Sequence, residues 1–135
     1  MARRRHKNEQ LNSALTDAKG AFRTAWILAA GEACAEFPFV GEFHFDATGA
    51  RKWRLDWACP ASRVAVEVDG IGYKRSDVGR HQMGEGFEED CLKLNTALAQ
   101  GWAVFRFTPA MLERDPAGCV EMVQSVMARR ESVHG

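Results

Sequence analysis

The decisive stretch of this sequence is Arg63-Val-Ala-Val-Glu67-Val-Asp69-Gly70. Alternate side chains of a β-strand point to the same side, so the three valines share one face and the two acids share the other. The preceding stretch, Arg51-Lys-Trp-Arg-Leu-Asp56-Trp-Ala-Cys-Pro60, reads as a neighbouring strand joined to it by a tight turn. Asp56, Glu67 and Asp69 are therefore predicted to meet at one place in a sheet.

Three neighbouring carboxylates repel one another unless a cation neutralises them. Oxygen-only donor sets of this kind suit Mg²⁺ or Mn²⁺, and such an ion is well suited to the hydrolysis of a phosphodiester. Basic side chains close to these strands and in the loop that follows predict contacts to the phosphates of DNA. They are Arg51, Lys52, Arg54, Lys74, Arg75 and Arg80.

The pattern around these strands predicts an α/β domain. The order of elements is a helix, a three-strand antiparallel meander, a helix, a strand and a final helix, and the last strand should lie parallel to residues 63–69. Helices on both faces of this mixed sheet would give a three-layer α/β/α arrangement. Helices are expected over 9–31, 87–100 and 109–130 (broken near Asp115), strands over 41–46, 52–58, 63–69 and 102–107, and a long functional loop over 70–86.

Composition predicts one globular domain over residues 9–135, preceded by a basic tail at 1–8. The chain has 135 residues, of which 46% are hydrophobic and 27% charged, values typical of a globular protein. Its formal net charge is zero, so any binding of a polyanion must depend on local basic surface. The tail is either a solvated segment or an arm that contacts DNA.

The sequence predicts a cytoplasmic protein without a membrane segment. It has no apolar stretch near the ~20 residues that a membrane-spanning helix needs, and its basic start does not lead into the apolar run of a signal peptide. The four cysteines are too far apart to suggest a zinc site or a disulfide framework, and a reducing compartment suits them. They are Cys34, Cys59, Cys91 and Cys119.

The ordered set of motifs resembles the PD-(D/E)XK nuclease superfamily, and within it the small very-short-patch-repair-like endonuclease domains of bacteria and their phages. The resemblance runs from Glu42 to about Met111. It implies a restriction-endonuclease-like fold and a Mg²⁺-dependent endodeoxyribonuclease of a bacterial cell or a phage-infected host. Besides the two acidic strands it is carried by Gly79-Arg80-His81, Gly86-Phe87-x-x-Asp90-x-x-Lys93-x-Asn95 and Gly101-Trp102-x-Val-x-Arg106-x-Thr108.

The resemblance also implies roles for single residues. The metal would be held by Asp56, Glu67 and the backbone carbonyl of Val68, with Asp69 as a further candidate ligand. Asp69 stands where the superfamily pattern has a catalytic lysine, so the cation must come from elsewhere. Lys93 is the favoured source, with Lys74, Arg75 and Arg80 as competitors, and His81 is a candidate general base, water-positioning group or general acid.

Two departures from the superfamily pattern keep other functions open. The lysine position holds an acid, and the glutamate that many members supply from the first helix has no clear counterpart, because Gly20-Ala21 stand about where it is expected. Asp17, Glu32 and Glu36 are the options for that ligand. The alternative function is a catalytically weak nuclease-fold protein used for DNA binding or complex assembly.

Several features keep more than one interpretation. Asp90 and Lys93 are three residues apart, which also suits an exposed helical ion pair, and His81 also fits an ordinary loop histidine. The preferred form of DNA stays open between mismatch, junction, duplex and single strand. A homodimer stays open as well, since a junction resolvase must cut two symmetric strands.

Overall fold

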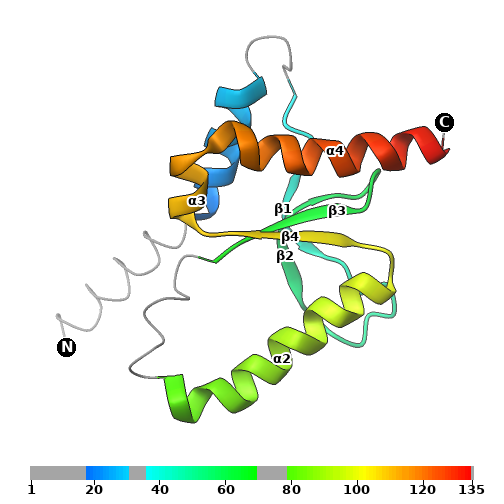
Figure 1. Cartoon of the computed structure of the whole chain (residues 1–135). Coiled ribbons are helices and arrows are strands. Elements are labelled where there is room, and N and C mark those ends of the chain that lie inside the picture. The colour runs from blue at the N-terminus through cyan, green and yellow to red at the C-terminus, as the bar shows by residue number, and fades with distance from the viewer. Residues whose placement is uncertain (1–17, 31–35, 70–78, 135) are drawn as a thin grey trace, which may run out of the picture.

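The computed structural model describes residues 18–30, 36–69 and 79–134, with the backbone alone described for 79–85 and 132–134. Figure 1 shows a central sheet with helices on either side of it. Residues 18–30 are helical. The remaining elements are β1 (Val40–His44), β2 (Arg54–Cys59), β3 (Val64–Val68), α2 (Gly79–Ala99), β4 (Ala103–Phe107), α3 (Pro109–Arg114) and α4 (Pro116–His134).

The four strands form one mixed sheet in the order β1-β2-β3-β4. β2 pairs antiparallel with both β1 and β3, whereas β3 and β4 are parallel. The antiparallel meander and the parallel last strand predicted from the sequence are therefore confirmed, as is the α/β class. The parallel pair requires a crossover, and α2 lies within that connection.

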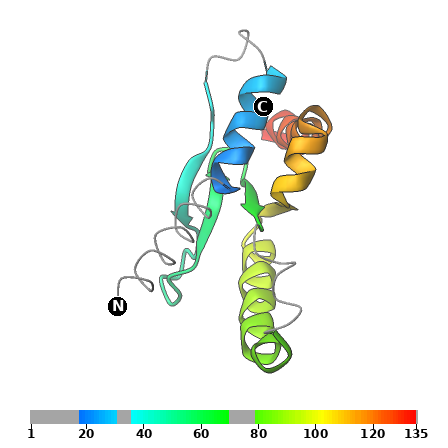
Figure 2. The same ribbon diagram turned by 90° about the vertical axis from the view of Figure 1, so that its left-hand side faces the viewer.

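Each face of the sheet is covered by its own apolar cluster. The valines of β3, Val64, Val66 and Val68, are buried together with side chains of the helix at 18–30 and of α4. On the opposite face, Ala65 of β3 packs with Ala97 of α2. In Figure 2, as in Figure 1, α4 lies above α2 and well apart from it. The valine face predicted from the alternation of β3 is confirmed.

The junctions between the later elements follow from local chemistry. The Thr108 side chain caps α3 by accepting a hydrogen bond from the Met111 backbone at 3.2 Å. Asp115 separates α3 from α4, and its carboxylate accepts from the backbone N–H of Gly118 at 3.0 Å. Pro116 then occupies the first turn of α4, where its missing N–H costs nothing. The break predicted near Asp115 is confirmed.

The start of α2 differs from the prediction. The helix begins at Gly79, so residues 79–86 are helical and the predicted loop over 70–86 is wrong in that part; residues 70–78 lie outside the described segments. The sequence of residues 79–86 lacks helical apolar periodicity, and its three glycines are typical of a loop, so the pattern predicted no helix there. Extending a helix already formed from Phe87 onward costs only about 1 kcal/mol per glycine, because nucleation is not repeated.

No helix within residues 18–30, 36–69 and 79–134 is long and apolar enough to cross a membrane.

Candidate active site

Asp56 and Glu67 lie next to each other on adjacent strands. Trp57 is paired with Val66, which brings the residue before Trp57 alongside the residue after Val66. The two carboxyl groups share a hydrogen bond. Asp56 is further fixed by the backbone N–H of Val68, which donates to its Oδ2 at 2.8 Å. The register of the meander thus joins two of the three acids that the sequence singled out.

Glu67 has an unusual electrostatic environment for an acidic side chain. Its side chain is only 14% exposed, and burial is the main reason why its pKa is raised to about 7, with the neighbouring Asp56 adding to the rise. Lys93 of α2 acts in the opposite direction through an ion pair of 2.5 Å between its Nζ and Glu67 Oε1. The structure therefore places Lys93, on the helix that covers this face, in direct contact with the half-buried acid.

A pocket of about 140 Å³ opens between the ends of β3 and β4 and the middle of α2. Charged groups of both signs line it, with Glu67, Asp69 and Asp90 on the acidic side and Lys93 and Arg106 on the basic side. A wall with both signs can hold a cation and an anionic group together. Asp90, three residues before Lys93 on α2, is half-buried in this wall.

Asp69 lines the same pocket but is directed to a different partner. Its Oδ2 accepts a hydrogen bond from Arg106 of β4 at 3.0 Å. The three acids therefore do not converge on one point: two form a pair and the third is neutralised by an arginine. Across the described segments, no set of three or more His, Cys, Asp or Glu side chains is arranged to hold a metal ion.

No family model, curated protein or solved structure matches this chain. The interpretation of the site consequently depends on its own chemistry. The acidic pair offers carboxylate oxygens, the donors that suit Mg²⁺ or Mn²⁺. Burial, and after it the neighbouring Asp56, raises the pKa of Glu67, and a bound cation would offset the repulsion between the two acids. Val68 lines the pocket as well, between Glu67 and Asp69.

Sequence reasoning missed Lys19 and Glu42. Lys19 lies in the helix at 18–30, one residue before the position at which a metal-binding acid was expected. Its Nζ is 3.2 Å from Asp56 Oδ1 and also forms an ion pair with Glu42 of β1. A lysine beside a glycine carries no motif, so only the packing of the helix on the sheet reveals this contact. Of the acids considered for that role, Asp17 and Glu32 lie outside the described residues, and Glu36 is exposed.

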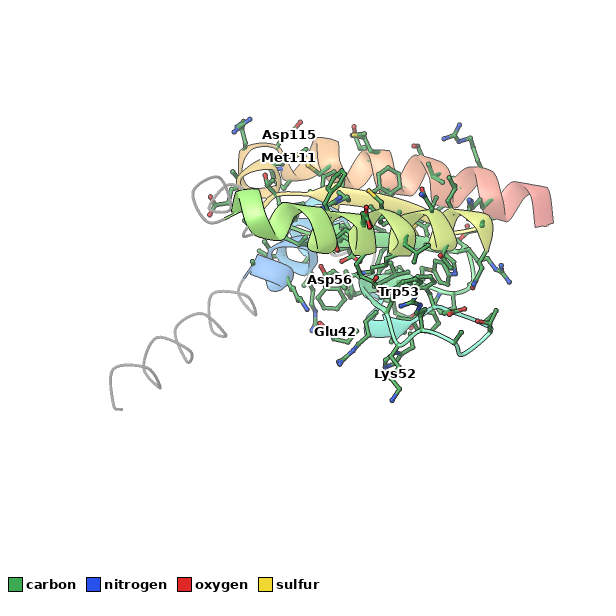
Figure 3. The ribbon with its side chains drawn as sticks, turned by 90° about the horizontal axis from the view of Figure 1, so that it is seen from below. Glu42, Lys52, Trp53, Asp56, Met111 and Asp115 are labelled. Atoms are coloured by element: carbon green, nitrogen blue, oxygen red, sulfur yellow. The ribbon has the colours of Figure 1, made fainter. Side chains whose placement is uncertain are left out.

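The predicted DNA-contacting side chains are only partly placed. Arg51 pairs with Glu89 at 3.4 Å, and Arg54 approaches Glu42 at 3.8 Å. Lys52 is exposed and points away from the body of the protein (Figure 3). Lys74 and Arg75 lie outside the described segments, while Arg80 and His81 are placed by their backbone alone, in the first turn of α2 and not in a loop.

Proposed function

We propose that this protein is a metal-dependent DNA endonuclease that hydrolyses phosphodiester bonds. The observation that carries the proposal is the half-buried pair of Asp56 and Glu67, in which Glu67 is paired with Lys93 and lines a small pocket of mixed charge. The mixed sheet with helices on both faces supports a restriction-endonuclease-like, three-layer arrangement for this domain.

In this proposal Asp56 and Glu67 hold a Mg²⁺ or Mn²⁺ ion, together with the backbone carbonyl of Val68 and with Asp69 as a further candidate. A bound ion would lower the pKa of a coordinated water and polarise the phosphate. The shared hydrogen bond between the two acids means that a proton must leave before the pair can act as a dianionic ligand. Metal binding therefore competes with protonation of Glu67.

In this proposal, other side chains supply positive charge and proton transfer. Lys93 compensates Glu67 and is close enough to the pair to stabilise negative charge that develops on the substrate, the task for which Asp69 is unsuited. His81, in the first turn of α2, is the candidate proton acceptor or donor. Phosphate contacts from Arg51, Lys52 and Arg54 would position the DNA backbone without reading its sequence.

A second candidate function is a nuclease-fold protein that binds DNA or assembles a complex but cleaves weakly. The neutralisation of the acids favours it: Lys19 contacts Asp56, Lys93 contacts Glu67 and Arg106 contacts Asp69. A cytoplasmic location in a bacterial or phage-infected cell, and a homodimer, belong to the proposal in both forms.

The test is a cleavage assay with Mg²⁺ and with Mn²⁺, with EDTA as the blank. Supercoiled plasmid, linear duplex, single strand and a four-way junction are offered in parallel to the wild type, to Glu67→Ala and to Glu113→Ala, a matched control on the exposed surface of α3. Metal-dependent cutting that disappears only in Glu67→Ala supports the endonuclease. Retained DNA binding without any cutting by the wild type supports the second candidate.

A further inference from the structure

Lys19 is a cation set between carboxylates from two strands. Its Nζ contacts Glu42 Oε1 of β1 and lies 3.2 Å from Asp56 Oδ1 of β2. Burial works to lower the pKa of Lys19, but the hydrogen bonds and charges of Glu42 and Asp56 outweigh it and the pKa is raised. The amine is therefore an ammonium at neutral pH.

The backbone at Lys19 is held by the sheet. Trp57 of β2 donates its indole N–H to the carbonyl oxygen of Lys19 at 2.9 Å. The same ring lies against Gly41 of β1 so closely that a Cβ at that position would be 3.3 Å from it. A glycine on one strand and a tryptophan on the next thus fix where the helix at 18–30 presents Lys19.

Glu42 is held in a conformation that side chains rarely adopt. Its φ of 52° is left-handed, although Glu42 is a strand residue and not a glycine. Such an outlier costs on the order of 1–3 kcal/mol and persists only where the surroundings enforce it. Here it accompanies the contact of Glu42 with Lys19, and the second carboxylate oxygen of Glu42 faces Arg54 at 3.8 Å.

Glu42, Asp56 and Glu67 follow one another across three neighbouring strands. Gly41 pairs with Trp57 and Phe43 with Leu55, which puts Glu42 opposite Asp56, and Asp56 in turn contacts Glu67. Figure 3 shows Glu42 and Asp56 in this part of the sheet. The row therefore has two positions at which a cation could lie between neighbouring carboxylates. The Lys19 ammonium occupies the first gap, between Glu42 and Asp56. In the second gap, Asp56 and Glu67 share a hydrogen bond.

Resting on the proposed function, we propose that Lys19 takes the place of a second metal cation, so that the centre binds one divalent ion and not two. Two-metal sites bridge a pair of cations about 3.5–4 Å apart with shared carboxylates. Asp56 is the shared carboxylate of this row, and its Oδ1 already contacts an ammonium. Lys19 is accordingly a positioning residue, which holds Asp56 and supplies the second positive charge through it.

The test counts Mn²⁺ ions bound per chain, by the loss of the free-ion electron paramagnetic resonance signal during titration. We expect one ion for the wild type and for Lys19→Arg, which keeps the cation. In Lys19→Glu we expect two, because the first gap then offers three carboxylates and no ammonium. Arg114→Glu, the same charge reversal at an exposed arginine of α3, should still bind one.

The outcomes separate this inference from the proposed function. Two ions in the wild type would overturn the role of Lys19 and leave a metal-dependent nuclease intact, whereas no bound ion would overturn metal dependence itself. A folded Lys19→Glu that still binds one ion also contradicts the inference. If circular dichroism shows that this variant is unfolded, Lys19→Gln decides, with a second, weaker ion expected and an unchanged count as the contrary result.

Discussion

Asp46, just after β1, and Glu67, within β3, are two carboxylates of one sheet with opposite surroundings. Asp46 accepts hydrogen bonds from the backbone N–H groups of Thr48 and Arg51 and from the side chains of Thr48 and Gln100. These bonds, that of Gln100 first, lower the pKa of Asp46 to about 2. Burial and the neighbouring Asp56 instead raise the pKa of Glu67 to about 7.

The difference shows what each acid is suited for. The donors around Asp46 belong to the turn at 47–50 and to Gln100, just after α2. The charge of Asp46 therefore stabilises the folded chain, and its oxygens are already occupied by hydrogen bonds. Glu67 has one ammonium and one competing acid as its partners, so a divalent cation would relieve the repulsion that the fold leaves in place. The first acid serves structure, and the second is available for chemistry.

The largest effect is expected from Glu67→Gln, which keeps the shape of the side chain and removes its charge. Under the proposed function, Glu67 is a direct metal ligand. Its loss should then lower the cleavage rate by more than about a hundredfold, because the loss of groups that only orient a metal ligand already costs 10–100-fold. Stability at pH 8 should be unchanged or higher, since a charge that burial disfavours is gone. A cleavage assay and a thermal melt measure both, and full activity would contradict the proposed role.

A smaller effect is expected in the free energy of unfolding, which Mg²⁺ should raise more at high pH than at low pH. Because the pKa of Glu67 rises from 4.5 to about 7 on folding, the folded chain keeps a proton that the unfolded chain has released between those values. Stability from this group is therefore lost as pH rises through about 7, and a metal can recover it only once the proton leaves. At saturation near a hundred times Kd, Mg²⁺ should add about 2.7 kcal/mol at pH 8 and far less at pH 5.5.

Thermal melts of the wild type and of Glu67→Gln, each with Mg²⁺ and with EDTA, check this dependence. The variant should lose the pH-dependent gain. Equal stabilisation of the wild type at both pH values would show that Mg²⁺ binds somewhere other than the acidic pair.

The parts of the fold that the sequence predicted depend on local patterns. The alternation of β3 fixed its buried face, and the turns between short strands fixed the meander. The contacts that were missed depend on packing between distant segments: Lys19 reaches Asp56 across 37 positions of the chain only because its helix docks on β2. Likewise, Asp69 was expected beside the other acids, but the parallel pairing of β3 with β4 brings Arg106 to it.

The smallest effect is expected from Asp46→Asn, which tests the structural half of the comparison. The amide cannot accept from all the donors that surround the carboxylate, so the melting temperature at pH 7 should fall by a few degrees.

The pKa of Asp46 is lowered on folding from 3.8 to about 2, so the stability that its charge provides is present above pH 3.8 and is lost as the pH falls through about 2. The gap between wild type and variant in urea midpoint should therefore narrow from pH 5 toward pH 3. Cleavage should be unchanged, because Asp46 makes its contacts with the turn and with Gln100; a loss of cutting as large as that of Glu67→Gln would remove the distinction between the two carboxylates.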